Sequence, residues 1–368
     1  MLRRIEEGKL RPGDRVPSES EFMRQYNVSR GTVTRALRDL EVTGVVNRRR
    51  GSGTFVRDPG RDADTRGKAM MNGDSPLHLA IFTPWTTTEK EAGAFHIALH
   101  HGISRVCSDH RATLTLQCLS SVGETQRERL INATRTLIDR RPKVVLYCGL
   151  ELPHDEMQLN MEVMDLLSEA GIDIVVIDRD VVPYPERSRF TWVSYDNRRG
   201  SALLVSHLHR QGYRRIAFVS IGNDSTAVFE RQAGYFDGLR LCGHDLTDDR
   251  VVVAGESVDE ELADRVLATK PDAVICKDTA YAARLSLLLG RRGLQIGRDI
   301  GMAGYDDDPV ASMLPVPLTV VRQPIAPFAA AAFRMASLIS SEKDHAMVAG
   351  SRIVIPTELV LRDSTRRD

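Results

Sequence analysis

The sequence lacks the long apolar runs that are typical of a membrane protein. No run approaches the roughly 18 residues that a transmembrane helix needs. The first residues, MLRRIEEGKLRPGD, contain neither the apolar core nor the small-residue cleavage site of a secretory signal. We therefore expect a cytoplasmic protein with no membrane partner.

Paired cysteines and metal-binding motifs are also missing. The five cysteines are scattered, odd in number and without a C-x-x-C pair, which fits reduced thiols better than a disulfide framework or a zinc site. His96 and His100 are spaced to share a helix face, but no H-E-x-x-H glutamate and no clear third ligand accompany them. We predict a histidine cluster on a helix surface and no metal site.

The motifs of two large enzyme classes are absent as well. The chain has no G-x-S-x-G elbow and no P-loop lysine motif. The adjacent residues Asp306 and Asp307 leave acid–base catalysis open at this point, because paired carboxyl groups can serve as acid and base.

Charge is distributed unevenly along the 368 residues, a length that suits about two or three domains. The whole chain has a formal net charge of zero, yet residues 1–57 contain 13 basic and 7 acidic side chains. A basic N-terminal segment on an acidic remainder indicates a polyanionic partner, although a solvated surface has the same composition.

The basic segment has the pattern of a helix-turn-helix. Ser18 and Glu21 form an S-x-x-E capping box, which predicts a helix from residue 19 to about 25. Ser29 can cap a second helix over 29–43, in which one apolar face consists of Val33, Ala36, Leu37 and Leu40. The other side of that helix is basic and rich in hydroxyl groups, as a DNA-reading helix requires.

A two-stranded hairpin is predicted after the second helix. Its tip is the flexible Gly51-Ser52-Gly53, and the arginines 48–50 precede it. Arginines at such a tip can neutralise phosphates or enter a minor groove.

Together these elements resemble the winged-helix domain of the GntR family of bacterial transcription regulators. The resemblance covers residues 2–57 and depends on the P-S-E, V-S-R-x-T-V and G-x-G-T-F-V motifs. Thr34 stands where many members carry a guanine-reading arginine, which leaves the base preference open. The predicted DNA-binding residues are Ser29, Arg30, Thr32, Thr34, Arg35, Arg48, Arg49, Arg50 and Gly51.

The rest of the chain predicts an α/β body behind a linker. Residues 58–76 show no periodicity and read as a flexible linker before an effector domain over 77–368. Apolar strands then alternate with amphipathic helices, which is typical of parallel sheets covered by helices. The predicted strands are 78–83, 112–118, 143–148, 172–177, 191–194, 215–220, 250–254, 273–276, 300–303 and 318–321. There are too many strands for one compact lobe, so we predict lobe 1 over about 77–190 and 322–341 and lobe 2 over about 191–321 and 350–365. Residues 181–190 are predicted to cross between them.

The body carries motifs in the order and spacing of the LacI family, whose effector domain is similar to periplasmic sugar-binding proteins. Among them are V-S-Y-D-N-R-R-G at 193–200, E-R-Q-A-G-Y-F-D-G-L at 230–239 and G-Y-D-D at 304–307. A GntR-type head on a LacI-type body is similar to arabinose-responsive repressors. The resemblance implies a winged helix-turn-helix joined to a two-lobed body with parallel sheets.

Ligands of open parallel sheets bind beyond the carboxyl ends of the strands. By resemblance, Arg231 and Asp306 hold ligand hydroxyls, although a structural ion pair remains the alternative. Asp278 matches an asparagine of the family, and its role is equally open. The loops add Asp178 and also Trp85, which is either a stacking plate or ordinary packing.

These observations predict a dimeric regulator, more plausibly a repressor, that binds a two-fold symmetric double-stranded DNA operator. A small hydroxylated effector, a sugar or sugar derivative, would bind between the lobes, and no enzyme activity or cofactor is expected. Two alternatives stay open: a GntR-type head fused to a pyridoxal-phosphate enzyme-like body, and a regulator responsive to nucleosides or purines.

Overall fold

The computed structural model describes most of the body and part of the head. The described residues are 14, 16–26, 28–29, 33, 46–49, 53–56, 76–83, 94–119, 125–150, 154–221, 225–246, 248–255, 257–341 and 348–367. Contacts divide the chain into two units, Met1–Pro76 and Leu77–Asp368, and each is described by itself.

The first unit contains the predicted capping box and hairpin. Helix α2, Glu19–Tyr26, begins after Ser18, whose backbone N–H donates to the Glu21 carboxylate at 2.6 Å. Strands β1, Val46–Arg49, and β2, Gly53–Val56, pair antiparallel. The Val16 N–H donates to the Thr54 carbonyl at 2.8 Å, which ties the hairpin to the segment before the helix.

The predicted second helix lies almost wholly outside the described residues. Within it, the Val33 N–H donates to the Ser29 carbonyl at 3.2 Å, the spacing of a helical turn, and Val33 is buried. The linker 58–76 also lies outside the described residues, apart from Pro76.

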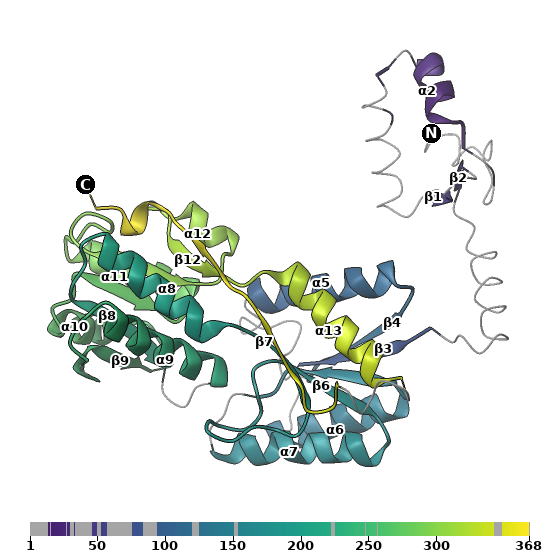
Figure 1. Cartoon of the computed structure of the whole chain (residues 1–368), viewed down its shortest axis with the longest axis horizontal. Helices are drawn as coiled ribbons and strands as arrows, with labels where there is room; N and C mark the ends of the chain where they lie inside the picture. The colour runs from purple at the N-terminus through teal and green to yellow at the C-terminus, as the bar shows by residue number, and fades with distance from the viewer. Residues whose placement is uncertain are drawn as a thin grey trace. The chain divides into compact units, whose positions relative to one another are not determined.

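The second unit consists of two α/β lobes (Figure 1). In lobe 1 a fully parallel sheet has the order β13-β7-β6-β5-β3-β4. Its strands are β3 His78–Phe82, β4 Thr113–Gln117, β5 Val144–Tyr147, β6 Asp173–Asp178, β7 Thr191–Tyr195 and β13 Arg352–Ile355. Its helices are α5 Ala94–Asp109, α6 Gln126–Asp139, α7 His154–Glu169 and α13 Ile325–Ile339.

Alternation along the strands of lobe 1 separates two apolar cores. Leu79 and Ile81 of β3 face one way and pack with α5 and α13, whereas Ala80 and Phe82 face α6 and α7. This follows from the two-residue period of a strand, and burial of both faces explains why the central strands are continuously apolar.

Lobe 2 repeats the plan with the order β14-β12-β11-β10-β8-β9, in which only the β12–β14 pair is antiparallel. Its strands are β8 Ile216–Ile221, β9 Val251–Ala254, β10 Ala273–Cys276, β11 Gly301–Tyr305, β12 Thr319–Arg322 and β14 Glu358–Val360. Its helices are α8 Asn197–Arg210, α9 Thr226–Leu241, α10 Glu260–Ala268, α11 Thr279–Arg291 and α12 Pro309–Met313.

The lobe boundaries differ from the prediction. Strand β7 bonds to β6, with Val175 opposite Thr191, so lobe 1 extends to Tyr195 and residues 181–190 join two strands of one sheet. Strand β13 also belongs to lobe 1, because it pairs in register with β7. The chain therefore crosses between the lobes after β7, after β12 and after β13. Sequence periodicity identified β7 as a strand but carries no information on its partner.

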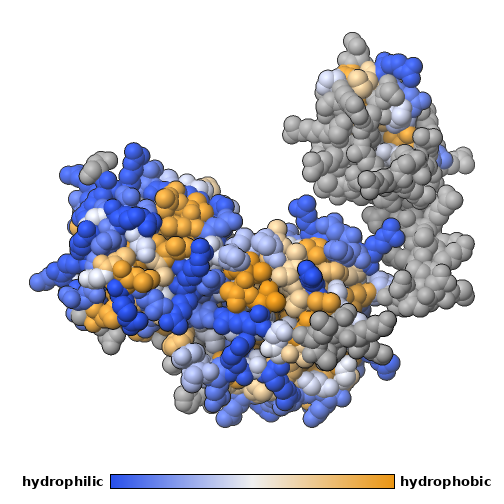
Figure 2. All heavy atoms as spheres, in the orientation of Figure 1, coloured by the Kyte–Doolittle hydropathy of each residue, from blue (hydrophilic) through white to orange (hydrophobic). Residues whose placement is uncertain are grey.

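None of the helices in the described part of the chain is long and apolar enough to cross a membrane. Hydrophilic residues cover much of the face of the body seen in Figure 2, with apolar patches between them.

Candidate functional site

Asp306 combines a left-handed backbone, a buried carboxyl oxygen and a raised pKa. It directly follows β11 and has a left-handed backbone, with φ of 71°. Its Oδ1 atom is buried and has no hydrogen-bond partner among the described residues. Burial raises the pKa of Asp306 to about 6, although the nearby charge of Arg231 opposes the shift. An unpaired buried acceptor of this kind is a place where a ligand hydroxyl can donate.

Arg231 lies beside this carboxyl and is held from three sides. Its side chain comes from the second turn of α9 and is buried. Nε donates to Asn197 Oδ1 at 3.0 Å, and Nη1 donates to the carbonyl of Lys277 at 2.7 Å. The guanidinium carbon lies 4.1 Å from the centre of the Tyr305 ring. Neither hydrogen bond uses Nη2, so the arginine is fixed in place and retains donors for a ligand.

Lobe 1 contributes Asp178, which ends β6 as Asp306 follows β11. It too has a left-handed backbone, with φ of 68°, and its side chain is buried. Arg179 Nε lies 3.4 Å from its Oδ2 atom. The negative charge of Asp178 contributes to the raised pKa of Asp306, as does that of Asp278. The carboxylate of Asp178 in lobe 1 therefore acts on Asp306 in lobe 2.

Tyr195, the last residue of β7, is influenced by the charges of both Asp178 and Asp306. Burial raises the pKa of its hydroxyl well above the ordinary value, and the charges of Asp178 and Asp306 raise it further. The ring stacks on Phe328 with a centroid distance of 4.5 Å. The hydroxyl is buried and lacks a hydrogen-bond partner within the described part of the chain. Tyr195 thus presents a neutral hydroxyl toward both lobes.

Two amides on the crossing segments complete the set. Gln323, just after β12, is 5% exposed, and neither its Nε2 nor its Oε1 finds a partner in the described ranges. Asn197, the first residue of α8, uses Oδ1 for Arg231 and leaves Nδ2 unpartnered among those residues. Buried polar groups are normally satisfied, so the unpartnered groups on two of the three crossings indicate a place for a polar molecule.

Asp278 has a role that the sequence did not reveal. It is the N-cap of α11: Oδ1 accepts from the Tyr281 N–H at 2.7 Å, and Oδ2 pairs with Lys277 Nζ at 3.0 Å. Both of its oxygens therefore have protein partners. The residue still shapes the electrostatics at Asp306, but its binding role remains a prediction.

The remaining predicted residues are placed only in part. Ser29 is exposed, and Arg48 and Arg49 lie in β1. The others lie outside the described residues: Arg30, Thr32, Thr34, Arg35, Arg50, Gly51 and Trp85. Sequence reasoning did not select Tyr195 or Gln323 as site residues. The available signal was a large polar side chain at the carboxyl end of a strand.

One group of residues in the described part has donor atoms suited to a metal. Atoms of His96, Cys148 and Asp178 lie within 4.8 Å of one another. Burial, followed by the charges of Arg179 and His100, lowers the pKa of His96 to about 3, so the imidazole is neutral. Arg179 Nη2 lies 3.5 Å from His96 Nε2 and its Nε is near Asp178. A positive charge already lies beside these donors, so we assign no metal to them. His96 and His100 are partly buried, unlike the predicted surface cluster.

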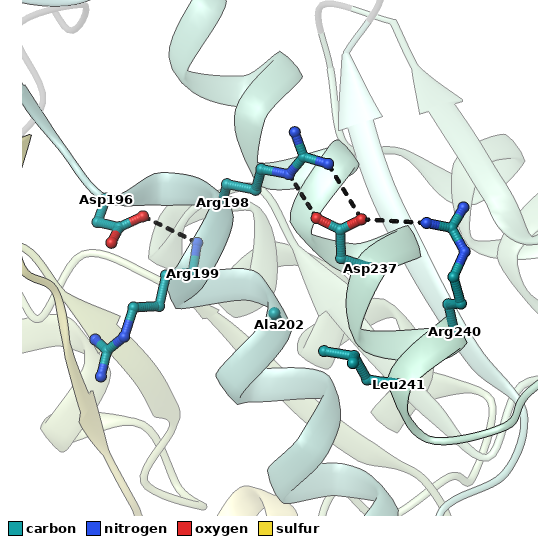
Figure 3. A pocket seen from close by; sticks show the side chains of 7 residues that line it. All are labelled: Asp196, Arg198, Arg199, Ala202, Asp237, Arg240 and Leu241. Carbon is teal, nitrogen blue, oxygen red and sulfur yellow. Dashed lines mark hydrogen bonds and ion pairs between the residues drawn. The ribbon is translucent and has the colours of Figure 1, made fainter.

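A hollow of about 380 Å³ lies between α8 and α9 and is lined by none of the candidate site residues named above, apart from the neighbours of Asn197 (Figure 3). Arg198 bonds to Asp237 from Nε at 2.5 Å and from Nη2 at 3.2 Å, and Arg240 approaches the same carboxylate at 3.6 Å. Asp237 thus pairs with both arginines, and its bonds to Arg198 join α8 to α9.

Comparison with known proteins accounts for both parts of the chain. Residues 1–56 match the family described as bacterial regulatory proteins, gntR family, and residues 205–365 match the periplasmic binding protein-like domain. The chain joins a GntR-type head to a periplasmic binding protein-like body. This confirms the predicted fold class.

Two curated relatives match the chain over almost its whole length. The head and body together are 26% identical to the arabinose metabolism transcriptional repressor of Geobacillus stearothermophilus, covering 98% of this chain and 93% of that one. Identity to the repressor of the same name from Halalkalibacterium halodurans is 23%, with the same coverage. A solved complex of the transcriptional regulator CelR with cellobiose superposes with a TM-score of 0.66 at 22% identity, covering 95% of this chain and 100% of that one. The lac repressor dimer bound to operator gives a TM-score of 0.64 at 17% identity, covering 84% and 99%.

Proposed function

We propose that this protein is a one-component transcription repressor whose affinity for its operator depends on a small hydroxylated molecule bound between the two lobes. The observation that carries the proposal is a set of buried polar atoms that find no partner among the described residues. They belong to Tyr195 of β7, to Asp306 directly after β11, and to Asn197 and Gln323 on two crossing segments. A protein loses stability by leaving such atoms unsatisfied, and a bound polar ligand recovers it.

The chemistry of the site favours a sugar or a sugar derivative. Asp306 offers a free carboxylate oxygen, Arg231 offers Nη2, and Tyr195 can donate or accept. Acceptors and donors side by side suit vicinal hydroxyls, each of which both donates and accepts. The names of two relatives, which mention arabinose and cellobiose, support this class.

The partner of the head would be a double-stranded DNA operator with two-fold symmetry, read by a homodimer. The support is the match of residues 1–56 to bacterial regulatory proteins and the described capping box and hairpin. Regulators of the helix-turn-helix type bind two half-sites with two recognition elements, so one head alone would bind weakly.

An enzyme function is the competing proposal. A pyridoxal-phosphate body would need a lysine for the Schiff base in a much longer domain, whereas residues 205–365 match a binding domain. Absorbance of the purified protein at about 400 nm would reveal a bound pyridoxal phosphate and would overturn our proposal.

A two-step experiment tests the proposed function. Thermal unfolding is first measured with L-arabinose, cellobiose, sugar acids and nucleosides, because a ligand at 100 times its Kd stabilises the folded state by about 2.7 kcal/mol. Operator DNA selected from a random pool is then titrated with and without each stabilising compound. Release of the DNA by a sugar supports the proposal. If only nucleosides stabilise the protein, the effector is a nucleoside rather than a sugar. If the protein selects no DNA from the pool, the proposed function is refuted.

A further inference from the structure

The beginning of α9 contacts lobe 1 at three points, although α9 belongs to lobe 2. The Asp180 backbone N–H donates to Thr226 Oγ1 at 2.9 Å. The rings of Tyr184 and Phe229 stack with a centroid distance of 5.5 Å and an angle of 24°. The third contact is an ion pair, in which Arg352 Nη2 lies 2.6 Å from Glu230 Oε1.

These three residues of α9 lie on one face of the helix. Thr226 is followed by Phe229 at i+3 and Glu230 at i+4, the spacings at which helical side chains are neighbours. One face of α9 therefore contacts two separate parts of lobe 1, the segment after β6 and the strand β13.

The arginine of the ion pair is held firmly within lobe 1. Its guanidinium carbon lies 4.1 Å from the centre of the Trp192 ring, and Nε lies 3.4 Å from Ser194 Oγ. Both partners are on β7, the neighbour of β13 in the sheet. The side chains of Arg352 and Glu230 are only 28% and 21% exposed, so the pair is shielded from water more than a surface ion pair.

The other faces of α9 belong to lobe 2 and to the candidate site. A Cβ added at Gly234 would lie 2.0 Å from the Arg198 carbonyl oxygen, so the backbones of α9 and α8 are in close contact at this point. The Arg198–Asp237 pair joins the same two helices (Figure 3). Arg231 follows Glu230 directly and points to Asn197 and Lys277. Because α9 is fixed to α8, moving lobe 1 away would break the Glu230 contact while Arg231 stays with lobe 2.

We propose that Glu230 and Arg352 form a latch that holds lobe 2, which carries Arg231, against lobe 1, which carries Asp178, and so positions the effector site. Effector binding and closure of the lobes are then one coupled equilibrium. This inference rests on the proposed function, but the latch is a physical property of the chain that can be measured without an effector.

Amide hydrogen exchange reports on the latch. The Asp180 N–H is protected by Thr226 only while the lobes are closed, so peptides covering 180–184 report closure. Glu230→Arg and Arg352→Glu each place like charges together and should raise exchange in these peptides by about tenfold. The charge-swapped double variant should restore the wild-type rate, and peptides of β5 should be unchanged in all three.

A matched control is the Arg127–Glu162 pair, which lies within lobe 1 at 2.6 Å. Arg127→Glu should leave exchange at 180–184 unaltered. Wild-type exchange in both single variants would overturn the latch, and so would a double variant that stays as open as the single ones.

The coupling to the effector site is measured by calorimetric titration with L-arabinose and with cellobiose. Each single variant should bind the sugar that the wild type binds about tenfold more weakly, and the swapped variant should bind it normally. Equal affinity in all variants would refute the coupling. If the wild type binds neither sugar, arabinose and cellobiose are excluded as effectors under the proposed function, and the exchange result still decides the latch.

Discussion

Asp306 and Asp307 are adjacent in sequence, yet the structure predicts opposite effects when each is replaced by asparagine. Asp306 has a pKa raised from 3.8 to about 6 by burial. Asparagine is close in size and tolerates the left-handed backbone found there, so Asp306→Asn removes the charge with little strain. At pH 7.5 the wild-type carboxylate is ionised in a place that disfavours the charge, and the variant is free of this cost.

The size of the effect follows from proton linkage. A shift of about 2 pKa units corresponds to about 3 kcal/mol at 1.36 kcal/mol per unit. Because the folded pKa is the higher one, the wild type gains this stability below pH 3.8 and loses it as the pH rises through about 6. Asp306→Asn should therefore be more stable than the wild type by about 3 kcal/mol at pH 7.5 and by less than about 1 kcal/mol near pH 4.

Asp307→Asn is the control with the opposite sign. Burial would raise the pKa of Asp307, but hydrogen bonds from Arg362 and Arg322 outweigh burial and lower it. These bonds measure 2.5 Å from Arg362 and 2.6 Å from Arg322. The variant should lose about 2 kcal/mol at pH 7.5, because two charge-assisted bonds are weakened. The stabilising effect of the ionised carboxylate is present above the ordinary pKa and is lost as the pH falls through the lowered one.

Urea unfolding of the full chain at several pH values between 4 and about 8 measures both variants. An Asp306→Asn protein that is no more stable than the wild type at pH 7.5 would refute the reasoning. A stability gain that persists unchanged at pH 4 would also refute it, because the gain would then not come from ionisation.

Other predictions concern the site, the head and the packing. Arg231→Ala should leave operator affinity nearly intact and abolish the effector response, since its side chain lies in the candidate site; a lowered melting temperature with loss of both properties would instead assign it a structural role. Arg30→Ala and Arg50→Ala should each weaken operator binding by about 1–3 kcal/mol in fluorescence anisotropy, and unchanged affinity of both would remove them from the interface. Operator affinity should fall with salt at a log–log slope of about −0.9 per phosphate neutralised, whereas a flat response would mean that the basic head is only solvated. Gly234→Ala should destabilise the fold by about 1–3 kcal/mol because the added Cβ meets the Arg198 carbonyl, while Gly290→Ala, with open space around it, should stabilise by about 0.5–1 kcal/mol; similar melting temperatures for the two would contradict this packing argument.

Sequence patterns within a few neighbouring residues were sufficient to predict most strands and helices of this protein. Alternating apolar strands and amphipathic helices predicted every strand of both sheets except β13 and β14, because these patterns depend on neighbours within a few positions. The capping box at Ser18 and Glu21 forms as predicted for the same reason. The two missed strands are short and only partly buried, so their apolar signal is weak.

The candidate site was predictable where it depends on strand ends. Parallel strands place their carboxyl ends at one edge, so Asp178, Arg231 and Asp306 were expected to converge. The charges of Arg231 and Asp178 both act on Asp306, in keeping with this expectation, and their role in ligand binding stays a prediction. Tyr195 and Gln323 were not selected from the sequence. A polar residue at a strand end becomes a candidate site residue only when its buried side chain has no hydrogen-bond partner in the protein, and this depends on all the residues packed around it.

The sequence by itself determined which segments become strands and helices, and that the head is basic. Only the tertiary structure decided that β7 and β13 belong to lobe 1, because strand pairing joins residues as far apart as Trp192 and Arg352. The pairing of β13 with β7 also brings Arg352 to Glu230 of α9, which is 122 residues away in the sequence. Hydrogen bonds and burial between distant segments fix these roles, and no pattern within a few neighbouring residues encodes them.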